Sequence, residues 1–285
     1  MGLDPMTICY LLILVNVLFS IQGFNRYDWK EKYVFSTERI LLMREYYRIV
    51  SSAFLHANWL HLLMNMLVLY MFSPYLSYAL PVWGYILVYF GSMIGGNLLS
   101  LYIHRNQSGY RALGASGAVN GVIFASIALF PNMTIWFFIP GWIFGIIYVL
   151  GSIYAIRNKR DNVGHDAHLG GAIVGILIAV ALRPEVLAVN GWIILAMVLP
   201  AAIFLYLIVT RPEILILPLD AVFPVFKEKP QSQAKIRDLK RKQSTKNAKF
   251  RSPEEEINFL LDKGVENLSP KEKKRLDELS GNIRE

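Results

Sequence analysis

Seven stretches of the chain approach the length and apolar character of a membrane-spanning helix, and this feature constrains the fold most. They cover residues 6–24, 57–76, 82–103, 114–130, 133–156, 166–183 and 190–210. A helix needs about 20 apolar residues to cross the hydrocarbon core of a bilayer. Lipid offers no partner for backbone amides, so each stretch is predicted to be helical. The sequence therefore predicts an all-α polytopic membrane protein.

The charged residues are distributed unevenly, in keeping with this prediction. Only 18% of the residues are charged, whereas about a quarter are charged in a typical soluble domain. Of the 29 Lys and Arg residues, ten lie within residues 227–251, and residues 59–101 contain none. The net charge of +8 therefore belongs largely to the tail, which we expect to contact anionic lipid head groups. No nucleic-acid-binding motif accompanies these residues, so nucleic acid is not an expected partner.

The segments outside the apolar stretches carry weaker signals. The loop over residues 25–55 mixes charges with aromatic residues and is predicted to lie in the membrane interface. Residues 214–226 are apolar but interrupted by prolines, which favours an interfacial connector. The Ser-Pro starts of residues 252–255 and 269–272 are typical helix N-termini, so the tail is predicted to contain a helical pair whose partner is unknown. The first stretch lacks a basic leader and a small-residue cleavage site, so we expect it to be retained.

Polar side chains cluster at the start of three predicted helices. The second carries His56, His61 and Asn65, and the last two share one helical face. The fourth begins with residues 114–117, Gly-Ala-Ser-Gly, and the sixth carries His168 about one turn inside. Even-numbered helices enter from the same side of the membrane, so these groups are predicted to share a shallow pocket that water can reach. A Ser nucleophile, a His base and nearby hydrogen-bond donors are the groups that acyl transfer needs.

Each element taken alone has a simpler interpretation. A Ser in a membrane helix usually bonds to its own backbone. His56 and His61 have a spacing that roughly allows a metal site, although no carboxylate or thiol accompanies them. Glycine pairs four residues apart often serve only helix packing. Cys9 is the single cysteine, which excludes an internal disulfide. Only the combination of the three elements favours hydrolytic chemistry over these readings.

In combination these residues resemble the rhomboid intramembrane proteases. The resemblance covers about residues 45–185, and its motifs are Tyr47-Arg48, His56-x4-His61-x3-Asn65, Gly114-x-Ser116-Gly117 and Gly164-x3-His168-x2-Gly171-x3-Gly175. It implies a six-helix core, and the apolar stretch over 190–210 would follow that core as a seventh transmembrane helix. It also implies peptide-bond hydrolysis by a dyad in which Ser116 is the nucleophile and His168 the general base, with no metal or organic cofactor. The implied partners are transmembrane protein substrates and membrane lipid.

The resemblance assigns roles to further residues. His61, Asn65 and the backbone amide of Ser116 would stabilise the oxyanion, and Asp166 would face away from the dyad. The residues implied to support the site structurally are His56, Gly114, Gly117, Gly171, Gly175, Arg48 and Asn120.

Two positions depart from the family pattern. Tyr47 stands where many relatives have Trp, and Asn120 stands where some carry an aromatic residue that stacks on the catalytic His. We expect Asn120 to hydrogen-bond His168 or to bind water.

This interpretation divides the chain into four parts. Residues 1–44 would hold the first helix and the start of the long loop, 45–185 the catalytic core, 186–226 the seventh helix and connector, and 227–285 the basic tail. The positive-inside rule favours a cytoplasmic pocket mouth, whereas better-known bacterial relatives open to the outside. A chain of this length without an organelle-type leader favours a bacterial plasma membrane.

Three other functions are compatible with parts of the pattern. A catalytically silent rhomboid-like protein would bind membrane clients without cutting them, although Ser116 and His168 are both present. A transporter would have polar residues through both leaflets, and a membrane metalloprotease would have carboxylate ligands. The sequence shows neither of these last two features.

Overall fold

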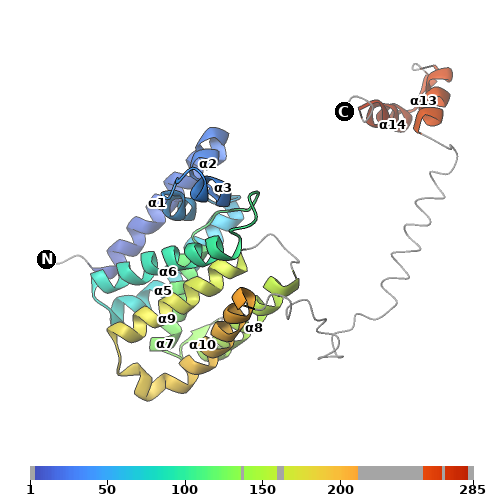
Figure 1. Cartoon of the computed structure of the whole chain (residues 1–285). Helices are drawn as coiled ribbons and strands as arrows, with labels where there is room; N and C mark the ends of the chain where they lie inside the picture. The colour runs from blue at the N-terminus through green and yellow to red at the C-terminus, as the bar shows by residue number, and fades with distance from the viewer. Residues whose placement is uncertain (1–3, 136–137, 159–163, 211–252, 265–266, 282–285) are drawn as a thin grey trace. The chain divides into compact units, whose positions relative to one another are not determined.

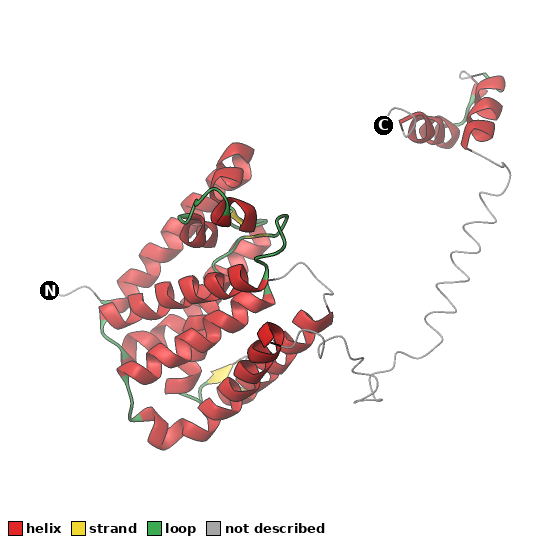
Figure 2. Ribbon diagram, viewed as in Figure 1, coloured by secondary structure: helices red, strands yellow, loops and turns green. Residues whose placement is uncertain are grey.

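The computed structural model describes residues 4–135, 138–158, 164–210, 253–264 and 267–281. The chain divides into two compact units, Met1–Leu217 and Pro218–Glu285, which we describe separately. Both consist mainly of helices in their described parts (Figure 2).

Seven helices make up the body of the first unit. They are α1 (Pro5–Asn25), α5 (Trp59–Ala79), α6 (Val82–Ile103), α7 (Ser116–Leu129), α8 (Gly141–Asn158), α9 (His165–Leu182) and α10 (Val186–Thr210). Within the described ranges, all of these except α7 and α8 are long and apolar enough to cross a membrane. The two exceptions are apolar but shorter. The predicted all-α polytopic fold with a seventh helix is therefore confirmed.

The helices expose apolar side chains and turn polar ones inward. On α5, Leu60 and Leu63 are 67% and 61% exposed. In the interior, Asn16 donates a hydrogen bond to the Tyr89 hydroxyl at 3.2 Å. This inside-out pattern is the one that a lipid environment selects, because buried polar groups then satisfy one another.

Helix α7 lies at the centre of the bundle, packed against α5, α6 and α9. Nearly all of its residues are buried, and Figure 1 shows α6 and α9 running side by side next to it. A Cβ atom added at Gly171 would lie 2.1 Å from the carbonyl oxygen of Gly117, and one added at Gly175 would lie 2.3 Å from that of Gly121. The backbones of α7 and α9 are therefore in direct contact, which brings the beginnings of these two helices together.

The loop after α1 is folded into short elements. These are α2 (Tyr27–Tyr33), β1 (Phe35–Ser36), α3 (Thr37–Leu41), α4 (Arg48–Ser51) and the 3-10 helix η1 (Ser52–Phe54). Arg48 is fully buried, pairs with Glu45 at 2.5 Å, and donates to the carbonyls of Glu31 and Val34 at 2.9 and 2.7 Å. Strand β1 pairs antiparallel with β2 (Arg111–Ala112). The loop is thereby tied to the segment that leads into α7.

Several helix boundaries differ from the predicted ones by a few residues. Helix α8 begins at Gly141 instead of residue 133, because β3 (Thr134–Ile135) and β4 (Ile139–Pro140) form a hairpin there. Pro140 lacks an amide hydrogen and restricts the residue before it to extended conformations, which favours this break. Helix α5 starts at Trp59 because the Asn58 side chain accepts a hydrogen bond from the His61 amide at 2.8 Å and caps it.

The second unit contains the predicted helical pair, α13 (Pro253–Asp262) and α14 (Pro270–Gly281). At the start of α14, the Ser269 amide donates to Glu272 at 2.9 Å, and the Glu272 amide donates to Ser269 Oγ at 3.4 Å. This is the reciprocal capping box that the sequence indicated. Leu260, Leu268 and Leu279 form the small core between the helices. The predicted connector over 214–226 and the basic segment 227–251 lie outside the described residues.

Candidate active site

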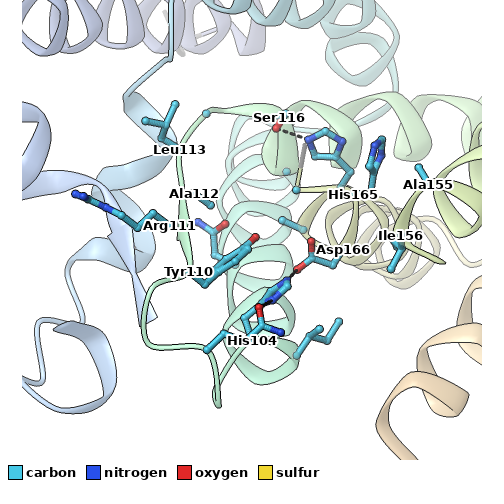
Figure 3. A pocket seen from close by; sticks show the side chains of 18 of the residues that line it. His104, Tyr110, Arg111, Ala112, Leu113, Ser116, Ala155, Ile156, His165 and Asp166 are labelled. Carbon is cyan, nitrogen blue, oxygen red and sulfur yellow. Dashed lines mark hydrogen bonds and ion pairs between the residues drawn. The ribbon is translucent and has the colours of Figure 1, made fainter. Parts of the chain in front are cut away.

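A cavity of about 830 Å³ lies where α7 and α9 begin. Its lining includes Gly114, Ser116, His168, His104, Tyr110 and Asp166. Figure 3 looks into this cavity: Ser116 with its hydrogen bond lies on one side, and His104, Tyr110 and Asp166 gather on another. Residues from helices far apart in the sequence thus meet in one recess.

Ser116 and His168 form a direct hydrogen bond across α7 and α9. Ser116 is the first residue of α7, and His168 lies one turn into α9, where its amide donates to the Gly164 carbonyl at 3.1 Å. Ser116 Oγ and His168 Nε2 are 2.6 Å apart. A hydroxyl in hydrogen-bond contact with an imidazole can be deprotonated as it attacks a carbonyl carbon.

The turn before Ser116 depends on Gly114. Its φ is +125°, a conformation that strongly favours glycine, and its amide donates to the Ser52 carbonyl at 3.1 Å. A Cβ atom at this position would lie 2.7 Å from the His61 ring and 3.7 Å from Ser116 Oγ. Gly114 therefore allows His61 and Ser116 to approach the same point.

His61 presents a hydrogen-bond donor to that point. Its Nδ1 accepts from the Ala57 amide at 3.4 Å, so the proton of the neutral ring lies on Nε2, the nitrogen that faces Gly114. Asn65 lies one turn further along α5, and its Nδ2 donates to the His61 carbonyl at 2.9 Å. His61 is thus placed beside Ser116, whereas Asn65 donates one of its two amide hydrogens to the backbone of its own helix.

His56 occupies a buried network behind the turn. Its Nε2 accepts from the Ala115 amide at 3.4 Å, its Nδ1 lies 2.8 Å from Ser20 Oγ, and that hydroxyl donates to the Phe54 carbonyl at 2.9 Å. This sequence of bonds needs a neutral ring with its proton on Nδ1. Burial, reinforced by the neighbouring His61 ring, lowers the pKa of His56 to about 3.

The His56 network predicts a pH-dependent stability. A His in the unfolded chain has a pKa of about 6.5. Between about pH 6.5 and 3, His56 is therefore protonated in the unfolded chain and neutral in the folded chain. The contribution of the neutral His56 ring to the free energy of unfolding is fully present above about pH 6.5. It is lost as the pH falls towards 3, by about 1.4 kcal/mol per pH unit. We expect the thermal midpoint in detergent to fall over this range, and His56→Gln to flatten the fall. Equal slopes in both proteins would contradict the prediction.

The hydrogen-bond partner of His168 Nδ1 differs from the one that the sequence predicted. Asn120 Nδ2 donates to the Ser116 carbonyl at 2.8 Å, on its own helix, and not to His168. The Nδ1 atom of His168 instead lies 3.3 Å from the hydroxyl of Tyr148 on α8. Sequence reasoning missed Tyr148, because a Tyr among apolar and aromatic residues carries no motif. The only signal was the missing aromatic at Asn120, which left a space beside His168 to be filled.

The remaining candidates hold the framework. Gly117 and Gly171 touch through the backbone contact of α7 and α9, as do Gly121 and Gly175. Asp166 pairs with His104 Nε2 at 3.2 Å, away from the dyad, and the His104 ring stacks on Tyr110 with centroids 3.6 Å apart. Across the described residues, no group of three or more His, Cys, Asp or Glu side chains could hold a metal ion.

Comparison with known proteins places this architecture in a family. The Rhomboid domain matches residues 43–185. Rhomboid protein 1, mitochondrial, of Saccharomyces cerevisiae is 31% identical over 185 residues, 61% of this chain and 52% of that protein. The putative rhomboid protease YdcA of Bacillus subtilis is 31% identical over 137 residues, 47% of this chain and 66% of that protein. Rhomboid protease AarA of Providencia stuartii is 27% identical over 203 residues, 62% and 72% of the two chains.

The family match covers residues 43–185, which contain most of the helical bundle. The chain spans about half the length of the yeast relative. Together with the apolar helices, these matches identify an integral, multi-pass membrane protein. Some of the relatives are named as proteases.

Proposed function

This chain belongs to the rhomboid family, and on that basis we propose that it is an intramembrane serine endopeptidase. Ser116 would be the nucleophile and His168 the general base. The substrates would be other membrane proteins, hydrolysed at peptide bonds in or near their transmembrane segments. The observation that carries the proposal is the 2.6 Å contact between Ser116 Oγ and His168 Nε2 inside a membrane-embedded bundle.

The proposed reaction has two halves. Ser116 Oγ forms a bond to the carbonyl carbon while its proton passes to His168 Nε2. The oxyanion accepts hydrogen bonds from His61 Nε2 and the Ser116 amide, with Asn65 as a further donor. The C–N bond then breaks, and His168 returns the proton to the leaving amine. Water, deprotonated by the same ring, hydrolyses the acyl-enzyme and frees Ser116.

The proposal extends to where the protein acts. We place it in a bacterial plasma membrane, with its pocket mouth and basic tail on the cytoplasmic side. Six basic residues in the first loop and ten within 227–251 support this orientation, against Arg183 on the opposite side. Cysteines introduced into 232–250 should then resist impermeant thiol reagents in intact cells. Labelling from outside would reverse the orientation without affecting the proposed chemistry.

Fluorophosphonate labelling tests the proposal without a known substrate. The purified wild type should react, and mass spectrometry of the adduct should map it to Ser116. Ser116→Ala should remain unlabelled and folded, because the change removes one oxygen atom and leaves the packing of α7 intact.

The same experiment addresses the competing function. A folded wild type that stays unlabelled would remove the protease proposal in favour of a silent rhomboid-like protein that binds membrane clients. Co-purification of membrane proteins would then be the next measurement.

A further inference from the structure

The second ring nitrogen of His168 has a partner that the proposed dyad does not use. Nε2 faces Ser116, and Nδ1 lies 3.3 Å from the Tyr148 hydroxyl. A general base must leave Nε2 unprotonated, so the proton of the neutral ring sits on Nδ1. The Tyr148 oxygen is placed to accept that proton in a hydrogen bond.

Tyr148 is held in position by aromatic contacts. Its ring meets Phe124 of α7 edge to face with centroids 5.5 Å apart, and Phe144 of α8 at 5.8 Å. Such pairs restrict a ring to one orientation. The hydroxyl is therefore presented to His168 by packing from two helices.

Two polar side chains lie beside the Tyr148 hydroxyl. Asn120 and Ser152 both interact with it. Asn120 Nδ2 donates one of its two hydrogens to the Ser116 carbonyl, and the second is the donor available to the Tyr148 oxygen.

The carboxylate nearest in sequence cannot take this role. Asp166 is two positions from His168, and its side chain pairs with His104. A serine protease triad uses a carboxylate to hold the tautomer and orientation of its imidazole. Here a phenol hydroxyl stands at the corresponding nitrogen.

We propose that Tyr148 is the positioning residue of the catalytic base: its oxygen accepts a hydrogen bond from the Nδ1 proton of His168 and so fixes the reactive tautomer, while Asn120 and Ser152 hold the hydroxyl in place. The inference rests on the proposed protease function.

The test is the rate of fluorophosphonate labelling of Ser116 from pH 5 to 9 in full-length protein. Tyr148→Phe removes one oxygen and keeps the aromatic packing, so we expect an unchanged thermal midpoint. The plateau rate should fall about tenfold, the equivalent of one neutral hydrogen bond. The acidic half-point of the rate profile should also move to lower pH, because the Tyr148 oxygen stabilises the protonated ring. His165, whose ring centroid lies 5.7 Å from that of His168, is present in both proteins, so its contribution cancels.

Two further single variants and one double variant serve as controls. Tyr154→Phe makes the same change on the same helix at a 39% exposed side chain and should leave rate and profile unchanged. Asn120→Ala should slow labelling less than Tyr148→Phe, and the double variant should be no slower than Tyr148→Phe alone.

The outcomes distinguish a failure of the positioning role of Tyr148 from a failure of the proposed protease function. An inert wild type would remove the protease function itself. An active wild type with Tyr148→Phe at the wild-type rate and profile would overturn the positioning role alone. A slower variant with an unshifted profile would mean that Tyr148 only packs, and would also overturn it.

Discussion

Replacing His168 with alanine is expected to lower peptide hydrolysis by at least about 10⁴-fold while the protein stays folded. Ser116 would then lack a base within hydrogen-bond distance, since the 2.6 Å contact of its hydroxyl is made with this ring. Loss of the base from serine proteases has effects of this size, and the oxyanion donors supply what remains. The measurement is cleavage of a reconstituted transmembrane substrate, with thermal unfolding as the check on folding.

Added imidazole provides the matched control for the His168 prediction. A free base that enters the vacated space should restore part of the activity of His168→Ala, and should have no such effect on Ser116→Ala. Activity of His168→Ala within tenfold of the wild type would show that another group is the base.

Gly171→Ala is expected to destabilise the bundle by about 3 kcal/mol. A Cβ at this position would lie 2.1 Å from the Gly117 carbonyl oxygen, and neither backbone can yield without separating α7 from α9. The thermal midpoint should fall by about 10 °C. Fluorophosphonate labelling should fall with it, because the same contact sets the spacing of Ser116 and His168.

Gly151→Ala on α8 is the control for this second prediction. Nothing lies within 4 Å of the Cβ that it adds, and alanine favours helix by about 1 kcal/mol over glycine. We therefore expect an unchanged or slightly raised midpoint. A Gly171→Ala midpoint equal to that of Gly151→Ala would mean that α7 and α9 are less tightly packed than the structure shows.

The pairing of Ser116 with His168 was implied by the resemblance to the rhomboid proteases. The sequence alone was sufficient for the order of the helices and for placing the starts of α7 and α9 on one side of the membrane. Both follow from properties visible in one dimension: apolar length predicts the spans, and alternating topology places the starts of even-numbered helices on one side. The capping box at Ser269 is equally local, and the structure shows it.

Tyr148 and the start of α8 could not be predicted in this way. The contact of Tyr148 with His168 depends on how α8 is rotated about its axis, and an apolar helix carries little information about rotation. The hairpin before Gly141 lies in the same apolar run as α8, so apolar length alone extended the predicted helix to residue 133, although Pro140 disfavours a helix there. The orientation of Asn120 depends on competition between its own backbone and a neighbour, which only three-dimensional packing decides.

Under the proposed protease function, the shortness of α7 would have a consequence for the products of cleavage. Its 14 residues span about 21 Å, against a hydrocarbon layer of about 30 Å. A substrate helix cut level with Ser116 would keep about 14 residues on the far side, too few to match the bilayer. Hydrophobic mismatch would then loosen the anchor of that fragment. In a protease of this shape, the depth of the nucleophile would itself help to release the product.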